Sequence, residues 1–180
     1  MPGALERMLS ADGLKVRQTL FFADSWHALV RIELSADKAR DVELAIVGRA
    51  MPLPGGHLVA DGDAVVQSFA DSPSTLATRL HADGAVADHA SVSGNDYRIA
   101  LDKSLHLEAG KPVTFYMVQT LRYDAHAQPP AIDYAHAWQA NRARWAGYLK
   151  SVDSSHLPGL PDEVARRVAA KAVVTLIGNW

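Results

Sequence analysis

The stretch LKVRQTLFFADSWHALVRIEL, residues 14–34, decides the fold class of this 180-residue chain. It holds two apolar-rich runs, residues 14–22 and 26–34, with Ala23, Asp24 and Ser25 between them. In the second run the side chains alternate with a period of two, which predicts a strand with one buried face made of Trp26, Ala28, Val30, Ile32 and Leu34. Two such runs joined by three residues predict an antiparallel hairpin.

Five more short strands are predicted before residue 122, which makes seven. They are DVELAIVG (41–48), AVVQSF (64–69), TLATRLH (75–81), DYRIALD (96–102) and VTFYMVQTL (113–121). The segment MPLPGG (51–56) is excluded as a central strand because its two prolines cannot donate to a ladder, and residues 82–95 are predicted to form a loop. Seven short strands bounded by turns predict a mainly β fold, an antiparallel β-sandwich of the supersandwich kind.

Behind Gln128-Pro129-Pro130 the apolar period becomes that of a helix. A first helix is predicted with Asp133 as its N-cap and with a single apolar stripe formed by Tyr134, Trp138, Trp145 and Leu149. After a loop, a second helix is predicted from Pro161 to a stop at Gly178. The predicted division is a β-sandwich over residues 1–128, a linker helix and loop over 129–159, and a further helix over 160–180.

Composition excludes several classes of function. Lys and Arg number 18 against 20 Asp and Glu, so a net charge of −2 offers no electrostatic basis for binding nucleic acid. Cysteine is absent, which excludes thiolate metal sites and cysteine catalysis. No run approaches the roughly 18 apolar residues of a membrane-spanning helix, and the start MPGALERMLSADG lacks the apolar core of a secretory signal. The cytoplasm and the bacterial periplasm both remain open as compartments.

No metal or cofactor is predicted. His81 and His89 flank a glycine-containing segment with Asp83 and Asp88, but this spacing matches no known ligand pattern, so a solvated loop is favoured. The run Asp61-Gly62-Asp63 lacks the later ligands of a calcium loop and is predicted to be a tight hairpin turn. Trp138 and Trp145 could form a sugar-stacking platform, but their shared helical stripe favours core packing.

The second helix is apolar on most sides between Ala169 and Ile177. Such a helix needs neighbours on more than one side, which a two-helix extension of one sandwich does not supply. We therefore expect the chain to be a piece of a larger protein. Self-association through the helix Val164–Ile177 is the other expectation.

The run VARRVAAKAVVTLIGNW, residues 164–180, resembles the segment where bacterial members of glycoside hydrolase family 63 enter their (α/α)6 catalytic barrel. The family's first barrel helix carries the pattern a-x-x-x-L-x-x-N-W, which Leu176, Asn179 and Trp180 match. The run WQANRARWAGYLKSV, residues 138–152, is similar to the family's linker helix, and the strands before it fit the family's N-terminal β-domain in kind. The resemblance covers most of the chain.

The resemblance implies an inverting, exo-acting, α-glucosidase-like parent enzyme that acts on an oligosaccharide or small glycoside. Inversion needs two carboxyl groups about 6.5–9.5 Å apart. In the family both lie in the barrel beyond the position of Trp180, so no catalytic residue is assigned to this chain, which is expected to hydrolyse nothing alone. Asn179 and Trp180 are predicted to touch substrate in the complete enzyme, because they lie in a loop past the helix stop.

Two alternatives from other classes stay open. One is a stand-alone β-sandwich that binds carbohydrate, and the other is an interaction domain that dimerises through its second helix. An exposed apolar face over Val164–Ile177 would favour the fragment or the dimer, whereas aromatic residues lining a groove in a closed monomer would favour the binding module.

Overall fold

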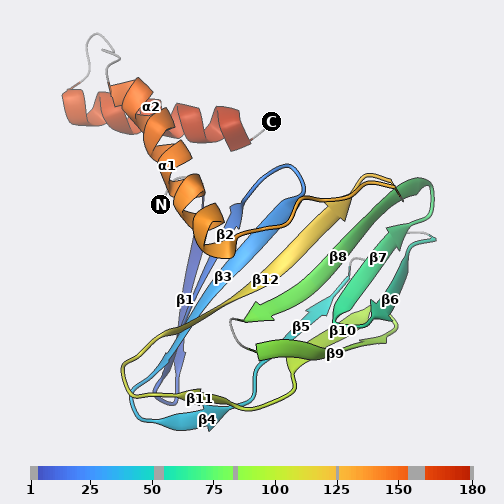
Figure 1. Ribbon diagram of the computed structural model, residues 1–180. Helices are drawn as coiled ribbons and strands as arrows, with labels where there is room; N and C mark the ends of the chain where they lie inside the picture. The colour runs from blue at the N-terminus through green and yellow to red at the C-terminus, as the bar shows by residue number, and fades with distance from the viewer. Residues whose placement is uncertain (1–3, 51–54, 83–84, 125, 154–160, 179–180) are drawn as a thin grey trace.

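The computed structural model describes residues 4–50, 55–82, 85–124, 126–153 and 161–178 (Figure 1). Its strands are β1 (Leu5–Ala11), β2 (Leu14–Phe22), β3 (His27–Ala36), β4 (Arg40–Val42), β5 (Ala45–Arg49), β6 (His57–Asp61), β7 (Ala64–Phe69), β8 (Ser72–Ala82), β9 (Ala85–Ser93), β10 (Asp96–Leu101), β11 (Leu105–Leu107) and β12 (Val113–Arg122). Its helices are α1 (Tyr134–Asp153) and α2 (Asp162–Gly178). All strand ladders are antiparallel, which confirms the predicted fold class.

The sheet divides at β8. On one edge β8 pairs with β12, which continues through β3 and β2 to β1. On its other edge, residues Ser72–Arg79 pair with β7, whereas His81 and Ala82 pair with the start of β9. The chain thus leaves the long sheet at the end of β8 and builds a second layer from β9, β10 and β5, while β4 and β11 form a separate two-stranded sheet at the end far from the helices (Figure 1).

The main core lies between these layers. Ile99 on β10 and Leu107 on β11 have no exposed surface, and Phe115 on β12 is 2% exposed. They pack in one cluster with residues of the long sheet, which include Ile32, Leu34, Val65 and Leu80. Because every layer contributes to this cluster, burial of apolar area holds the layers together.

β3 is buried on both faces, although its alternating sequence predicted only one buried face. Ile32 and Leu34 point into the main core as predicted, but His27 and Leu29 on the opposite face are also buried. Leu29 packs with Phe21, Tyr116 and Val118 in a second cluster. The reason is α1, whose Tyr134 and Trp138 cover this face of the long sheet.

Two predicted segments need correction. The strand predicted over 41–48 is two strands, since β4 pairs with β11 whereas β5 pairs with β10. The loop predicted over 82–95 contains β9, whose Ala90 and Val92 pack on the main core. Its alternate residues, His89, Ser91 and Ser93, are polar, so the segment lacks the β-formers that mark a strand in sequence.

The start of the chain also forms a strand that the sequence analysis did not find. All seven residues of β1 are exposed, so it has no buried face and no hydrophobic period to recognise. The turn after β1 has the sequence Asp12-Gly13, which is typical of two-residue hairpin turns. Both residues have the positive φ that such turns need, 48° and 74°. The predicted turn at Asp61-Gly62-Asp63 is confirmed as the hairpin between β6 and β7.

Phe115→Ala should lower the free energy of unfolding by ~3 to 5 kcal/mol, because it removes a fully enclosed ring from the main core. The matched control is Phe22→Ala, since Phe22 is 63% exposed and its loss should change stability by under ~1 kcal/mol. Urea unfolding followed by circular dichroism measures both. Equal losses for the two variants would show that the main core does not lie where the structure places it.

Candidate functional site

The first turn of α1 is held to the long sheet by an aromatic stack. The ring of Tyr134 lies 4.0 Å from that of His81 and 5.2 Å from that of Tyr116, measured between centroids, and both pairs are stacked. His81 and Tyr116 are cross-strand partners on β8 and β12. Burial raises the pKa of Tyr134, so its hydroxyl stays protonated near neutral pH. The solvated loop predicted at His81 is wrong, because His81 lies half-buried on β8 and is part of this stack.

The next turn of α1 adds a second aromatic anchor. The rings of Trp138 and Phe21 are 5.1 Å apart, and the guanidinium carbon of Arg31 lies 5.7 Å from the centre of the Trp138 ring. Trp145, two turns later, is 8% exposed. The predicted core packing of both tryptophans is confirmed, and these rings are engaged by protein neighbours rather than presented as a platform for sugar.

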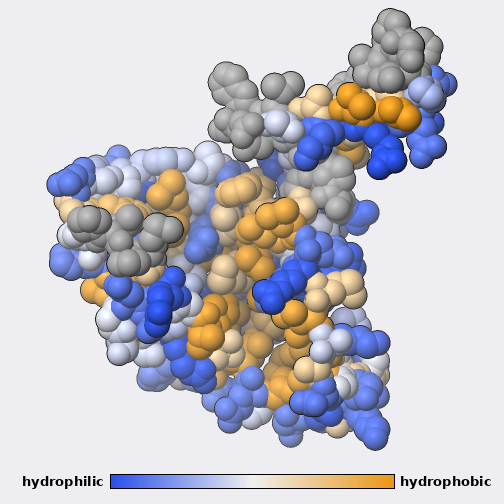
Figure 2. Space-filling view, turned by 180° about the vertical axis from the view of Figure 1, so that it is seen from behind, coloured by the Kyte–Doolittle hydropathy of each residue, from blue (hydrophilic) through white to orange (hydrophobic). Residues whose placement is uncertain are grey.

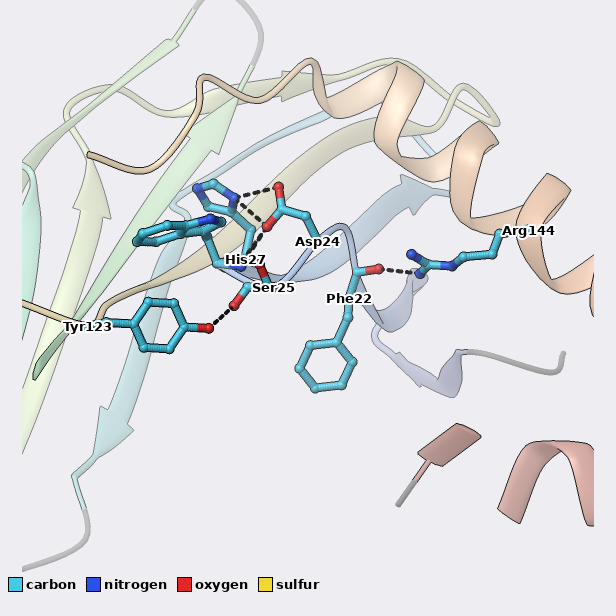
Figure 3. A network of polar contacts seen from close by, with 7 residues as sticks. Phe22, Asp24, Ser25, His27, Tyr123 and Arg144 are labelled. Atoms are coloured by element: carbon cyan, nitrogen blue, oxygen red, sulfur yellow. Dashed lines mark hydrogen bonds and ion pairs between the residues drawn. The ribbon is translucent and has the colours of Figure 1, made fainter. Parts of the chain in front are cut away.

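Polar contacts tie the middle of α1 to the turn between β2 and β3 (Figure 3). Arg144 Nη2 donates to the carbonyl oxygen of Phe22 at 2.9 Å and to Asn141 Oδ1 at 2.8 Å. The start of the helix is capped as predicted, because Asp133 Oδ1 accepts from the backbone N–H of His136 at 2.9 Å. The helix is thus fixed along several turns, so its direction relative to the sheet is defined.

The turn that receives Arg144 is itself rigidly held. Asp24 Oδ1 accepts from the backbone N–H groups of Trp26 and His27 at 2.7 and 2.9 Å, and His27 Nδ1 lies 2.9 Å from the same oxygen. Tyr123 donates its hydroxyl to the carbonyl oxygen of Ser25 at 2.7 Å (Figure 3). Burial alone would raise the pKa of Asp24, but the hydrogen bonds from His27 and the two amides outweigh it and lower the pKa below 3.8.

α2 packs on α1 on the side away from the sheet (Figure 1). Ala165 on α2 is 4% exposed, whereas Val164 and Val168, one turn apart, are 43% and 48% exposed. Together with Arg167, Ala170 and Lys171 they form one side of the helix, which we call the α2 face. Figure 2 shows apolar atoms of α2 flanked by strongly hydrophilic ones. The result is a surface with an apolar centre and a basic rim, on a helix that packs against α1.

The predicted substrate residues Asn179 and Trp180 lie outside the described residues, and so do the side chains of Val174, Leu176 and Ile177. The exposed apolar helix face expected over Val164–Ile177 is therefore observed at Val164 and Val168. His89 is exposed on β9. The anchors of the site, among them Tyr134, Arg144 and Asp24, were not foreseen as a group, because their contacts join residues up to 122 positions apart.

Among the residues that the structure describes, no group of three or more His, Asp or Glu side chains is placed to hold a metal ion. In the same part of the chain neither helix is long and apolar enough to cross a membrane.

The chain is similar to known proteins in structure rather than in sequence. No protein-family model matches the sequence, and no curated protein matches it. Among solved structures, the chain is similar to one described as "Putative kojibiose phosphorylase from human microbiome", with a TM-score of 0.49 and 14% sequence identity. The match covers 96% of this chain and 23% of that one, so this chain spans about a quarter of the other's length. Similarity at this level establishes neither a family nor an activity.

Asp24→Asn should remove a pH-dependent part of the stability. Because the pKa of Asp24 is lowered by folding, its contribution is complete above the ordinary value of 3.8 and is lost as the pH falls through the folded-state pKa. We expect a loss of ~1 kcal/mol at neutral pH that disappears in acid. Thermal unfolding between pH 2 and 7 measures it, with Asp71→Asn in an exposed turn as the control. A loss that is the same at every pH would contradict the role assigned to the carboxylate.

Arg144→Met should loosen α1 from the sheet without unfolding the sandwich. It removes the hydrogen bond to the Phe22 carbonyl and one to the buried amide of Asn141, at a cost of ~1 to 2 kcal/mol. The matched control is Arg142→Met on the exposed side of the same helix. Hydrogen exchange should speed up in α1 and α2 for Arg144→Met and not for the control. Unchanged α1 exchange would show that the aromatic anchors hold the helix alone.

Proposed function

We propose that this chain is the non-catalytic N-terminal region of a larger glycoside hydrolase, and that it braces a helical catalytic domain. The observation that carries the proposal is the α2 face. Val164 and Val168 are about half exposed on α2, which packs on α1, and the stack at Tyr134 and the bond from Arg144 hold α1 to the sandwich. An exposed apolar face of this kind is suited to a permanent neighbour rather than to solvent.

The chemistry of the α2 face defines that neighbour. The apolar centre fits the side of another helix, and the basic rim formed by Arg167 and Lys171 favours acidic residues around the contact. In the proposed enzyme α2 is the first helix of an (α/α)6 barrel, and the next barrel helices cover Val164 and Val168. The resemblance of residues 164–180 to the barrel entry of glycoside hydrolase family 63 supports this assignment.

The proposed reaction is the removal of a terminal α-linked sugar with inversion, by two carboxylates that the barrel supplies. This chain would contribute a wall of the sugar cleft at Asn179 and Trp180, just after α2. The alternative use of the α2 face is self-association, in which a second copy supplies the apolar neighbour.

The test starts from the native polypeptide that contains this sequence, captured with an antibody against the sandwich. We expect an intact mass well above 19.4 kDa and hydrolysis of α-glucosides, with the anomer of the released sugar inverted when followed by NMR. Sugar release only in the presence of inorganic phosphate would reassign the reaction to phosphorolysis. A native polypeptide of 19.4 kDa that sediments as a dimer would overturn the proposal in favour of self-association.

The same polypeptide tests the role of the α2 face. Val168→Asp should lower its thermal midpoint and its activity together, because a carboxylate would be buried against the barrel. Arg166→Asp is the control, since Arg166 is an exposed α2 residue on the opposite side of the helix from Val164 and Val168. Equal effects of both substitutions would show that the valine face carries no special contact.

A further inference from the structure

A cavity of about 150 Å³ lies between the two layers of the sandwich, away from both helices. Its polar lining comes from four neutral side chains: Gln67 on β7, Thr78 on β8, Gln119 on β12 and Tyr97 on β10. Leu58 and Leu76 supply apolar walls. Gln119 on β12 lies directly opposite Thr78 on β8. Gln67 on β7 lies opposite Leu76, which is two residues before Thr78 on the same strand. The polar groups therefore gather at one place rather than being scattered through the core.

These side chains point inward, where a sandwich is normally apolar. Thr78 lies two residues before Leu80 on β8, and Gln119 lies four after Phe115 on β12, so each shares the inner face with a main-core residue. Thr78 is 5% exposed. Burial raises the pKa of Tyr97, in keeping with a hydroxyl removed from bulk water. Polar groups in such a position are usually retained only when something satisfies their hydrogen bonds.

No other described residue satisfies them. None of the four side chains makes a hydrogen bond with the part of the chain that the structure describes. Their polar atoms are also not fully enclosed, since among the described residues the one buried side-chain polar atom without a hydrogen bond belongs to Glu33. Their donors and acceptors therefore face open space in the cavity. Two amides and two hydroxyls offer both kinds of hydrogen bond, which is what a set of alcohol groups needs from its neighbours.

The charge of the cavity restricts the ligand further. Its one ionised lining residue is Arg49, whose Nε and Nη2 donate to the two carboxylate oxygens of Asp96 at 2.6 and 2.9 Å. This pair is neutral as a unit, so the cavity offers no uncompensated charge to an anion or a cation. Its volume equals that of about five water molecules at ~30 Å³ each, well below the ~300 Å³ or more of drug-sized sites.

We propose that this cavity is a binding site for one small neutral polyhydroxy compound, of a size between glycerol and a monosaccharide. The amides of Gln67 and Gln119 and the hydroxyls of Thr78 and Tyr97 bind its hydroxyl groups, and the two leucines contact its carbon skeleton. The site is separate from the α2 face and does not depend on the proposed glycosidase function.

The test is an NMR titration of the isotopically labelled 180-residue chain with glycerol, xylose and glucose, each up to 100 mM. We expect saturable shifts of the backbone amides of Thr78, Gln119 and Tyr97 for at least one probe, with a dissociation constant on the order of 1 to 10 mM. Inorganic phosphate should leave the same amides unshifted. Shifts that rise linearly with every probe, or saturation with phosphate, would overturn the proposal and leave a hydrated cavity only.

Two variants keep the result specific. Thr78→Val and Gln119→Met preserve shape and remove a hydrogen-bonding group, so each should weaken binding about 10-fold. Gln139→Met makes the same change on the exposed side of α1 and should leave binding unchanged. Thermal unfolding of each variant confirms that it is folded, which we expect because an apolar group is well accommodated in a core. Binding that is equal in all four proteins would place the ligand elsewhere.

Discussion

Tyr134 lies over two neighbouring side chains of the long sheet, His81 and Tyr116, and the arrangement of the molecule depends on this stack. It joins a helix to strands that end 12 and 52 residues earlier in the chain. Together with Trp138 it covers a face of β3, β12 and β8 that would otherwise be open to water. The central strands are therefore buried on both sides, by the second β layer on one and by α1 on the other. This double burial makes the sandwich a firm base for the helices.

The two candidate sites, the α2 face and the cavity between the β layers, both follow from that arrangement. α1 places Tyr134 and Trp138 on the sheet, and α2, which packs on α1, leaves Val164 and Val168 exposed. Between the β layers, the apolar cluster around Phe115 and Ile99 gives way to Gln67, Thr78 and Gln119. The α2 face lacks an apolar neighbour, and the cavity lacks hydrogen-bond partners. Each site is defined by an interaction that the described chain does not complete.

Much of the fold could be predicted from local signals. β2 and β7 have the predicted bounds, and α1 begins directly after its predicted cap, Asp133. Two strands were missed for different reasons. β1 is exposed along its whole length and has no buried face, whereas β9 is built mostly from Ala, Ser, Asp and His, which are poor strand formers. In both cases pairing with a neighbouring strand, rather than local preference, makes the segment extended. The sequence predicted that α2 is an apolar helix, but it did not predict that α2 packs on α1 or that Arg144 ties α1 to the sheet.

By itself the sequence determined the change from strands to helices behind residue 128, the hairpin turn at Asp61-Gly62-Asp63, the cap of α1 and the apolar character of α2, because each depends on residues a few positions apart. Only the tertiary structure decided which faces are covered. The polar inner residues Thr78 and Gln119 come together through ladders between β8 and β12, 41 positions apart in the chain. The bond from Arg144 to the Phe22 carbonyl spans 122 positions. Contacts of that separation have no local pattern, since they form only when distant strands pair and the helix packs on them.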